Sequence, residues 1–214
     1  MMKKIIILLI SLLLLTAVAC SEPFEPKLSG SLVGLYYASE NTIADMKEKG
    51  ITGLDDHTLL DALTAQDGYD ITSSSIRADA EAEIYKFASN NLTVLSFNGS
   101  YFMLGDANGG YGVVSTLLHD LDGDGINEIY FTYCTGEANK GRVGCYVQAT
   151  ASVLICETEF DTPLLAVATA RGGLDLYAAT VDYGKFAEDH INAQVNANEK
   201  ISSLKLNEGI LTCE

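Results

Sequence analysis

The 214-residue sequence contains no tryptophan, only three prolines and three histidines, and just 13 lysines and arginines against 29 acidic residues. So few prolines, with 19 glycines, exclude a collagen-like or proline-rich chain. The absence of tryptophan disfavours a sugar-binding aromatic platform. The net charge of −16 repels phosphate backbones, so we expect cations and no nucleic acid as partners. Hydrophobic residues make up 48%, which predicts a buried core.

The first residues have the pattern of an export signal. Lys3 and Lys4 precede the uncharged run Ile5–Ala19. As a helix this run spans about 22 Å, which is less than the ~30 Å core of a bilayer. We therefore predict a removable signal peptide over residues 1–19 rather than a permanent membrane span.

A cysteine follows this run. Ala17-Val18-Ala19-Cys20 resembles the lipobox of bacterial lipoproteins, although the family prefers leucine at the place of Ala17. The resemblance implies that Cys20 receives diacylglycerol, becomes the first mature residue and anchors the protein to the membrane of the cell envelope. Ser21 resembles the class that Gram-negative bacteria sort to the outer membrane. The alternative is an ordinary signal peptide cut after Ala19, leaving Cys20 free.

The segment after the cysteine predicts a tether. Residues 20–27 contain Pro23 and Pro26, which favour an extended chain that lifts a domain off the bilayer. Residues 28–214 show no repeat and no linker, so we predict a single domain. Without the two leader lysines the mature chain has 11 basic and 29 acidic residues, a net charge of −18.

Three short helices are predicted in the N-terminal half. The first begins at the capping box Thr42-Ile43-Ala44-Asp45 and ends at Gly50. The second is capped within the pair Asp55-Asp56. The third covers about Arg77–Ala88, because apolar residues recur there at helical spacing while charged residues such as Lys86 lie mostly off this stripe. We expect all three to pack on a sheet.

Strand signals dominate from Leu92 onwards. Leu92–Phe97 and Ser100–Leu104 flank Asn98-Gly99, a strong hairpin signal because both residues need positive φ. Residues 186–198 fit either a helix or a polar loop. These patterns predict an α+β fold, an antiparallel β-rich domain with a few short N-terminal helices. The later predicted strands are Val113–His119, Glu128–Cys134, Arg142–Gln148, Ser152–Thr158, Leu164–Ala170, Leu174–Thr180, Ile201–Leu206 and Ile210–Cys213.

The most specific motif is the acidic stretch Asp120–Glu128. Acidic side chains occupy relative positions 1, 3, 5 and 9, and Gly125 at position 6 permits a sharp turn. Ca²⁺ needs six to eight oxygens at about 2.3–2.6 Å, and a tight loop supplies them by pointing alternate side chains inward. We predict a calcium site, with the Ile126 carbonyl as one ligand and Glu128 binding directly or through water. The full predicted ligand set is Asp120, Asp122, Asp124, Ile126 and Glu128.

The surroundings of this motif distinguish it from an EF-hand. Its flanks are rich in β-formers, and Phe131 stands where an EF-hand has a bidentate glutamate. The motif resembles the calcium loop of FG-GAP and VCBS-type repeats, where the loop joins two strands and a glycine-led strand follows, here Ile129–Tyr133 and Gly141–Val147. The resemblance implies one such unit at about residues 117–155, whereas a propeller needs at least four blades. The alternatives are an ion-free turn or an ion that only rigidifies the loop.

Cys134, Cys145 and Cys156 are spaced by 11 residues each. With turns centred near residues 139–140 and 150–151, they would form one row across three strands, where one adjacent pair can form a disulfide. Cys213 could pair with a leftover cysteine, since export permits disulfides. The alternative is that all are small buried hydrophobic residues.

Sequence motifs of common enzyme classes are absent. We find no G-x-S-x-G, P-loop, G-x-G-x-x-G, H-E-x-x-H or zinc-type cysteine spacing. We therefore predict no catalytic residue and a surface module that is calcium-binding and structural or binds a glycan or protein ligand. One alternative is a lipid-anchored hydrolase with dispersed acidic catalytic residues, indicated by two carboxylates facing each other across a deep pocket. Another is a subunit of an envelope complex, indicated by a large exposed apolar patch.

Overall fold

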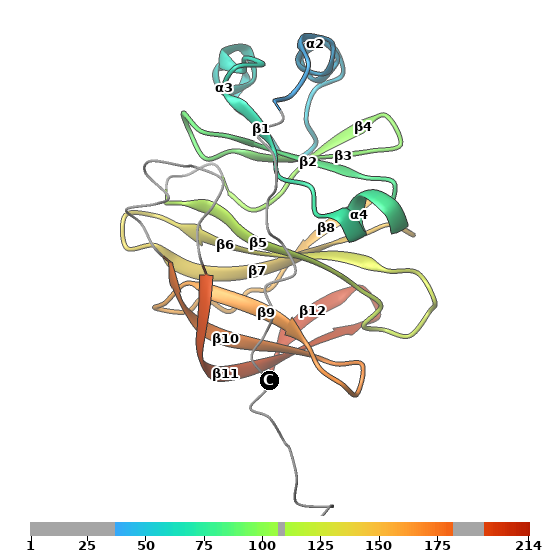
Figure 1. Ribbon diagram of the computed structural model, residues 1–214, viewed down its shortest axis with the longest axis vertical. Helices are drawn as coiled ribbons and strands as arrows, with labels where there is room; N and C mark the ends of the chain where they lie inside the picture. Colours follow the sequence, from blue (N-terminus) through green and yellow to red (C-terminus); the bar gives the residue numbers. More distant parts are fainter. Residues whose placement is uncertain (1–36, 107–109, 182–194) are drawn as a thin grey trace, which may run out of the picture.

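The computed structural model describes residues 37–106, 110–181 and 195–214, which leaves the predicted signal peptide, Cys20 and the tether outside the described residues. The described chain is a stack of layers, with two helices above three antiparallel sheets of four strands each (Figure 1). This confirms the predicted β-rich α+β class. Each helix in these ranges is too short or too polar to cross a membrane.

Each sheet is built from four strands that are consecutive in the chain. The N-terminal sheet contains β1 (Gly68–Asp70), β2 (Glu83–Phe87), β3 (Thr93–Phe97) and β4 (Ser100–Met103). The central sheet contains β5 (Gly112–His119), β6 (Glu128–Thr135), β7 (Lys140–Val147) and β8 (Ser152–Ile155). The C-terminal sheet contains β9 (Leu164–Ala168), β10 (Leu174–Val181), β11 (Val195–Asn207) and β12 (Ile210–Cys213).

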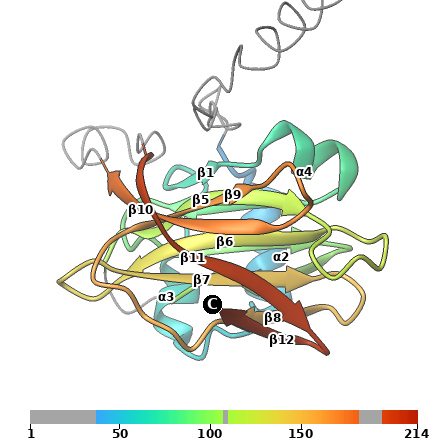
Figure 2. The same cartoon turned by 90° about the horizontal axis from the view of Figure 1, so that it is seen from below.

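Three apolar interfaces hold the layers together. Helices α2 (Glu40–Lys49) and α3 (His57–Ala62) cover the N-terminal sheet through residues such as Met46 and Phe87. The N-terminal and central sheets meet around Phe131 and Tyr146, and the central and C-terminal sheets meet around Tyr130. Successive residues of β6 therefore face opposite neighbours, and the central sheet is buried on both faces. Figure 2 shows β9 lying over β5 and β6, with which it packs.

The first two predicted helices are present. The Ser39 side chain caps helix α2 by accepting a hydrogen bond from the Thr42 amide at 3.0 Å, so the N-cap lies three residues before the predicted Thr42. The helix ends at Gly50, as predicted, with φ of +78°. Helix α3 is capped by Asp56, which accepts from the Thr58 amide at 2.8 Å.

The third predicted helix is wrong. Residues 74–79 form the short helix α4 (Ser74–Asp79), and the chain then turns into strand β2. Strand β2 lies between β1 and β3, and it is buried on both faces, with Ile84 toward the central sheet and Phe87 toward the helices. Apolar residues on two opposite faces of a short strand imitate helical spacing in so short a stretch.

Most predicted strands are present. The Asn98-Gly99 hairpin is confirmed, with φ of +50° and +71° joining β3 to β4. Strand β1 was not predicted, and β11 begins six residues before the predicted Ile201. Residues 186–194 of the ambiguous stretch lie outside the described residues. Its last four residues, 195–198, belong to β11.

The predicted row of three cysteines is wrong. Cys134 pairs with Gly141, and Cys145 lies between Tyr130 and Leu154. The β6–β7 pairing joins Thr135 to Lys140, so this turn is centred earlier than we predicted. The four described cysteines are free thiols, and Cys134, Cys145 and Cys156 are buried, as the alternative expected.

Candidate metal centre

The acidic loop joins two neighbouring strands of the central sheet. His119, the last residue of β5, pairs with Glu128, the first residue of β6, so residues 120–127 form the connection. Both strands are packed between the other two sheets, which fixes the two ends of the loop. The predicted strand–loop–strand context is therefore present.

Three of the predicted ligands lie together. Asp120, Asp122 and Asp124 each offer a carboxylate oxygen within 4.8 Å of the others. Asp122 and Asp124 are exposed and Asp120 is half-buried, so a solvated ion can reach all three. Among the ion pairs of the described residues, no lysine or arginine pairs with any of them.

Backbone amides of the loop hold these carboxylates in place. Asp120 accepts hydrogen bonds from the Gly123 amide at 2.7 Å and the Gly125 amide at 3.0 Å. Asp124 accepts from the Ile126 amide at 2.7 Å. Gly125 has φ of +87°, which confirms the predicted sharp turn, and a left-handed backbone suits glycine best. Hydrogen bonds within the loop thus hold its acidic side chains close together.

The other two predicted ligands are placed differently. Glu128 is 1% exposed, and its Oε2 accepts hydrogen bonds from the Leu121 amide at 3.2 Å and the Tyr130 hydroxyl at 3.0 Å. Burial raises the pKa of its carboxyl. It is not one of the three grouped carboxylates, and it fastens the start of the loop to β6. The direct or water-mediated role of Glu128 and the ligation by the Ile126 carbonyl stay predictions.

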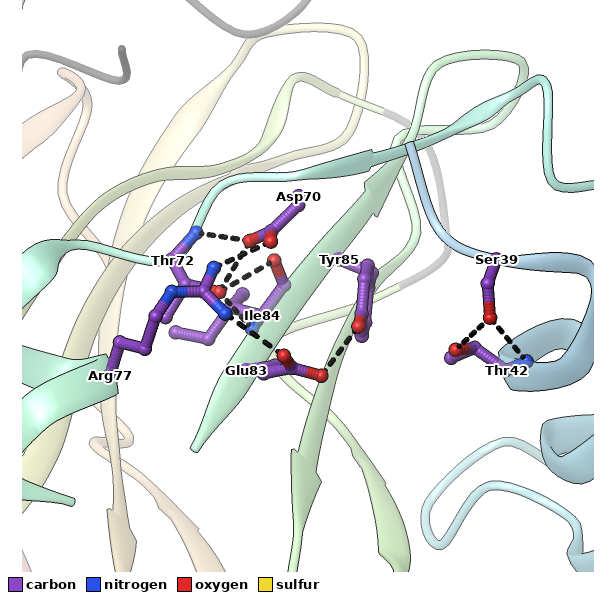
Figure 3. A network of polar contacts seen from close by, with 8 residues as sticks. All are labelled: Ser39, Thr42, Asp70, Thr72, Arg77, Glu83, Ile84 and Tyr85. Carbon is purple, nitrogen blue, oxygen red and sulfur yellow. Dashed lines mark hydrogen bonds and ion pairs between the residues drawn. The ribbon is translucent and has the colours of Figure 1, made fainter. Parts of the chain in front are cut away.

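A second charged cluster surrounds Arg77 on the N-terminal sheet (Figure 3). Arg77 pairs with Asp70 and with Glu83, whose other oxygen accepts from the Tyr85 hydroxyl at 2.6 Å. The guanidinium is shared by both carboxylates, so this cluster ties α4 to β1 and β2. Sequence reasoning missed it, because its members come from three elements and the third helix was misplaced.

A surface hollow in the described part of the chain is lined by Tyr37, Ala65 and Gln66. None of these described lining residues is a carboxylate. His119, next to the acidic loop, has its Nε2 2.9 Å from the Gly172 carbonyl oxygen.

No protein-family model, curated protein or solved structure matches the chain.

Proposed function

We propose that the protein is a lipid-anchored component of the bacterial cell envelope whose loop 120–128 binds Ca²⁺ and stiffens the β5–β6 hairpin of a structural or ligand-binding module. The observation that carries the metal proposal is the approach of three carboxylates without a basic partner among the described residues. The anchoring proposal depends on the leader and on Cys20.

The charge of the loop favours a divalent cation. Carboxylates held within 4.8 Å of one another repel, and a cation between them replaces that repulsion with attraction. An all-oxygen site in a flexible loop suits Ca²⁺ better than Mg²⁺, which demands near-ideal octahedral geometry and gives up its waters reluctantly. Water and backbone carbonyls complete the shell in such sites.

The packing of β5 and β6 limits the structural effect of Ca²⁺ binding to the loop. The strands on either side are packed already, so the ion orders the loop without having to fold the domain. Extracellular calcium modules bind at about 10⁻⁴–10⁻³ M. With a dissociation constant of about 1 mM, 10 mM Ca²⁺ stabilises the folded state by about 1.4 kcal/mol.

The experiment compares the thermal unfolding of the full-length protein in EDTA, in 10 mM Ca²⁺ and in 10 mM Mg²⁺. We expect Ca²⁺ to raise Tm by roughly 3–6 °C, Mg²⁺ to raise it less, and the double variant Asp122→Ala with Asp124→Ala to lose the rise. The matched control, Asp55→Ala with Asp161→Ala, removes two exposed carboxylates elsewhere and should keep the rise. An absent Ca²⁺ effect in the natural protein, or an equal effect in the loop variant, contradicts the proposal.

A further inference from the structure

Two cysteine thiols from different sheets lie close together. The Sγ atoms of Cys156 and Cys213 are 3.0 Å apart, although 57 positions separate them in the chain. Cys156 directly follows β8 of the central sheet, and Cys213 is the last residue of β12 in the C-terminal sheet. The contact therefore bridges two layers of the stack.

Backbone hydrogen bonds hold both residues in position. The Cys156 amide donates to the Val143 carbonyl at 2.9 Å. Cys213 pairs with Leu204 across β11 and β12, and the next residue, Glu214, exchanges two backbone hydrogen bonds with Ser203 at 2.8 and 2.9 Å. A disulfide needs the sulfurs about 2.05 Å apart, so they have to approach by only about 1 Å.

We propose that Cys156 and Cys213 are a modification site and form an inter-sheet disulfide when the protein meets an oxidant of the disulfide class. The oxidant in the cell depends on the proposed export to the envelope, where disulfides persist. The chemistry of the pair does not depend on the calcium loop or on the anchor.

Exposure indicates the order of the two exchange steps. Cys156 is 1% exposed and Cys213 is half-buried, so an external disulfide reaches Cys213 first. Cys213 attacks one sulfur of the oxidant as its proton leaves, forms a mixed disulfide and expels the first thiolate. The Cys156 thiolate then attacks the Cys213 sulfur and expels the second. The two protein protons end on the two released thiols, and the oxidant is reduced by two electrons.

The surroundings distinguish this pair from the other described cysteines. In the reduced pair, the hydrogen bond from the Cys213 thiol lowers the pKa of Cys156 to about 6, so the two sulfurs share a proton at neutral pH. Burial instead raises the pKa of Cys134 and of Cys145 to about 12, and both side chains are fully buried. These two cysteines serve as internal controls.

The test uses reduced full-length protein in detergent, incubated with oxidised glutathione and digested without reductant. Chymotrypsin can cut after Tyr146 and so separates Cys145 from Cys156. We expect one cross-linked peptide pair joining Cys156 to Cys213, a loss of two mass units and a rise in Tm of roughly 5–10 °C that dithiothreitol reverses. Cys156→Ser should accumulate glutathione on Cys213, whereas Cys134→Ser should cross-link normally.

Three results would overturn the inference. These are four unmodified thiols among the described cysteines, glutathione on Cys213 of the natural protein without a cross-link, or a cross-link that involves Cys134 or Cys145. Because Asp122→Ala with Asp124→Ala should cross-link as well as the natural protein, failure of the calcium proposal leaves this result unchanged.

Discussion

At the residue scale, Lys86 is an unusual member of the core. It is 2% exposed, and its Nζ donates to the carbonyl oxygens of Tyr111 at 2.6 Å and Val113 at 2.8 Å. The lysine belongs to β2 of the N-terminal sheet, and Val113 belongs to β5 of the central sheet, so one side chain links two layers. Desolvation lowers the pKa of Lys86 to about 7.

This pKa predicts a pH-dependent contribution to stability. Between about pH 7 and pH 10.5 the unfolded chain binds more protons at Lys86 than the folded chain, so the free energy of unfolding rises with pH. From pH 6.5 to 8.5 we expect the natural protein to gain about 2 kcal/mol relative to Lys86→Met, as measured by urea unfolding. The tyrosines and the other lysines are common to both proteins and cancel in this difference. A difference that does not change with pH would contradict the buried, titrating lysine.

The position of Lys86 could not be predicted from its neighbours in sequence. The helical spacing around it suggested a charged residue off the apolar stripe, and the acceptors that hold it come from a different sheet. The orientation of Glu128 has a more local cause, since its partners Leu121 and Tyr130 lie in the same loop and strand. The three grouped aspartates could be predicted, since their geometry arises within a single loop.

At the element scale, β7 illustrates how closely neighbouring strands of the central sheet pack. Gly144 lies between Phe131 and Ile155 in the central sheet. A Cβ atom there would lie 2.5 Å from Phe131 Cζ and 2.8 Å from the Leu154 carbonyl oxygen. The glycine is therefore required by close approach, since its φ lies outside the left-handed region.

We expect Gly144→Ala to destabilise the fold by about 2–3 kcal/mol through overpacking. The comparison is Gly99→Ala, where φ is +71° and only Lys49 Nζ lies near, at 3.7 Å, so that backbone strain alone costs about 1 kcal/mol. Urea unfolding of both variants measures the two costs. If Gly144→Ala destabilises the fold no more than Gly99→Ala does, the central sheet accommodates the added methyl group and the overpacking argument is wrong.

Short-range patterns predicted the hairpins and caps, because the residues that determine them are neighbours in the chain. Asn98-Gly99 and Asp56 are examples. The prediction of a helix in place of strand β2 failed because distant residues determine its conformation. Its conformation is determined by burial between α2, α3 and the central sheet, and a periodicity over five residues does not distinguish two buried faces from one helical stripe.

At the scale of the whole molecule, composition and patterning predicted a β-rich α+β domain but not its layers. The two-sided burial of the central sheet depends on residues of all three sheets. The proposed attachment to a membrane is a separate question, since that proposal depends on Cys20 and the leader, which precede the described residues.

The anchor proposal predicts a change in phase behaviour. In Triton X-114 partitioning, the natural full-length protein should enter the detergent phase, and Cys20→Ser should move to the aqueous phase because it carries no acyl chains. Ser21→Ala, which keeps the cysteine, is the matched control and should stay with the detergent. Detergent partitioning that survives the loss of Cys20 would refute the anchor.

The chain order of the strands has a consequence for biogenesis. Since every sheet uses one uninterrupted stretch of sequence, its hydrogen-bond ladder can be completed without residues that arrive later. Such local connectivity shortens the search for native pairings and speeds folding. A polypeptide that emerges amino-terminus first can therefore assemble this domain one layer at a time.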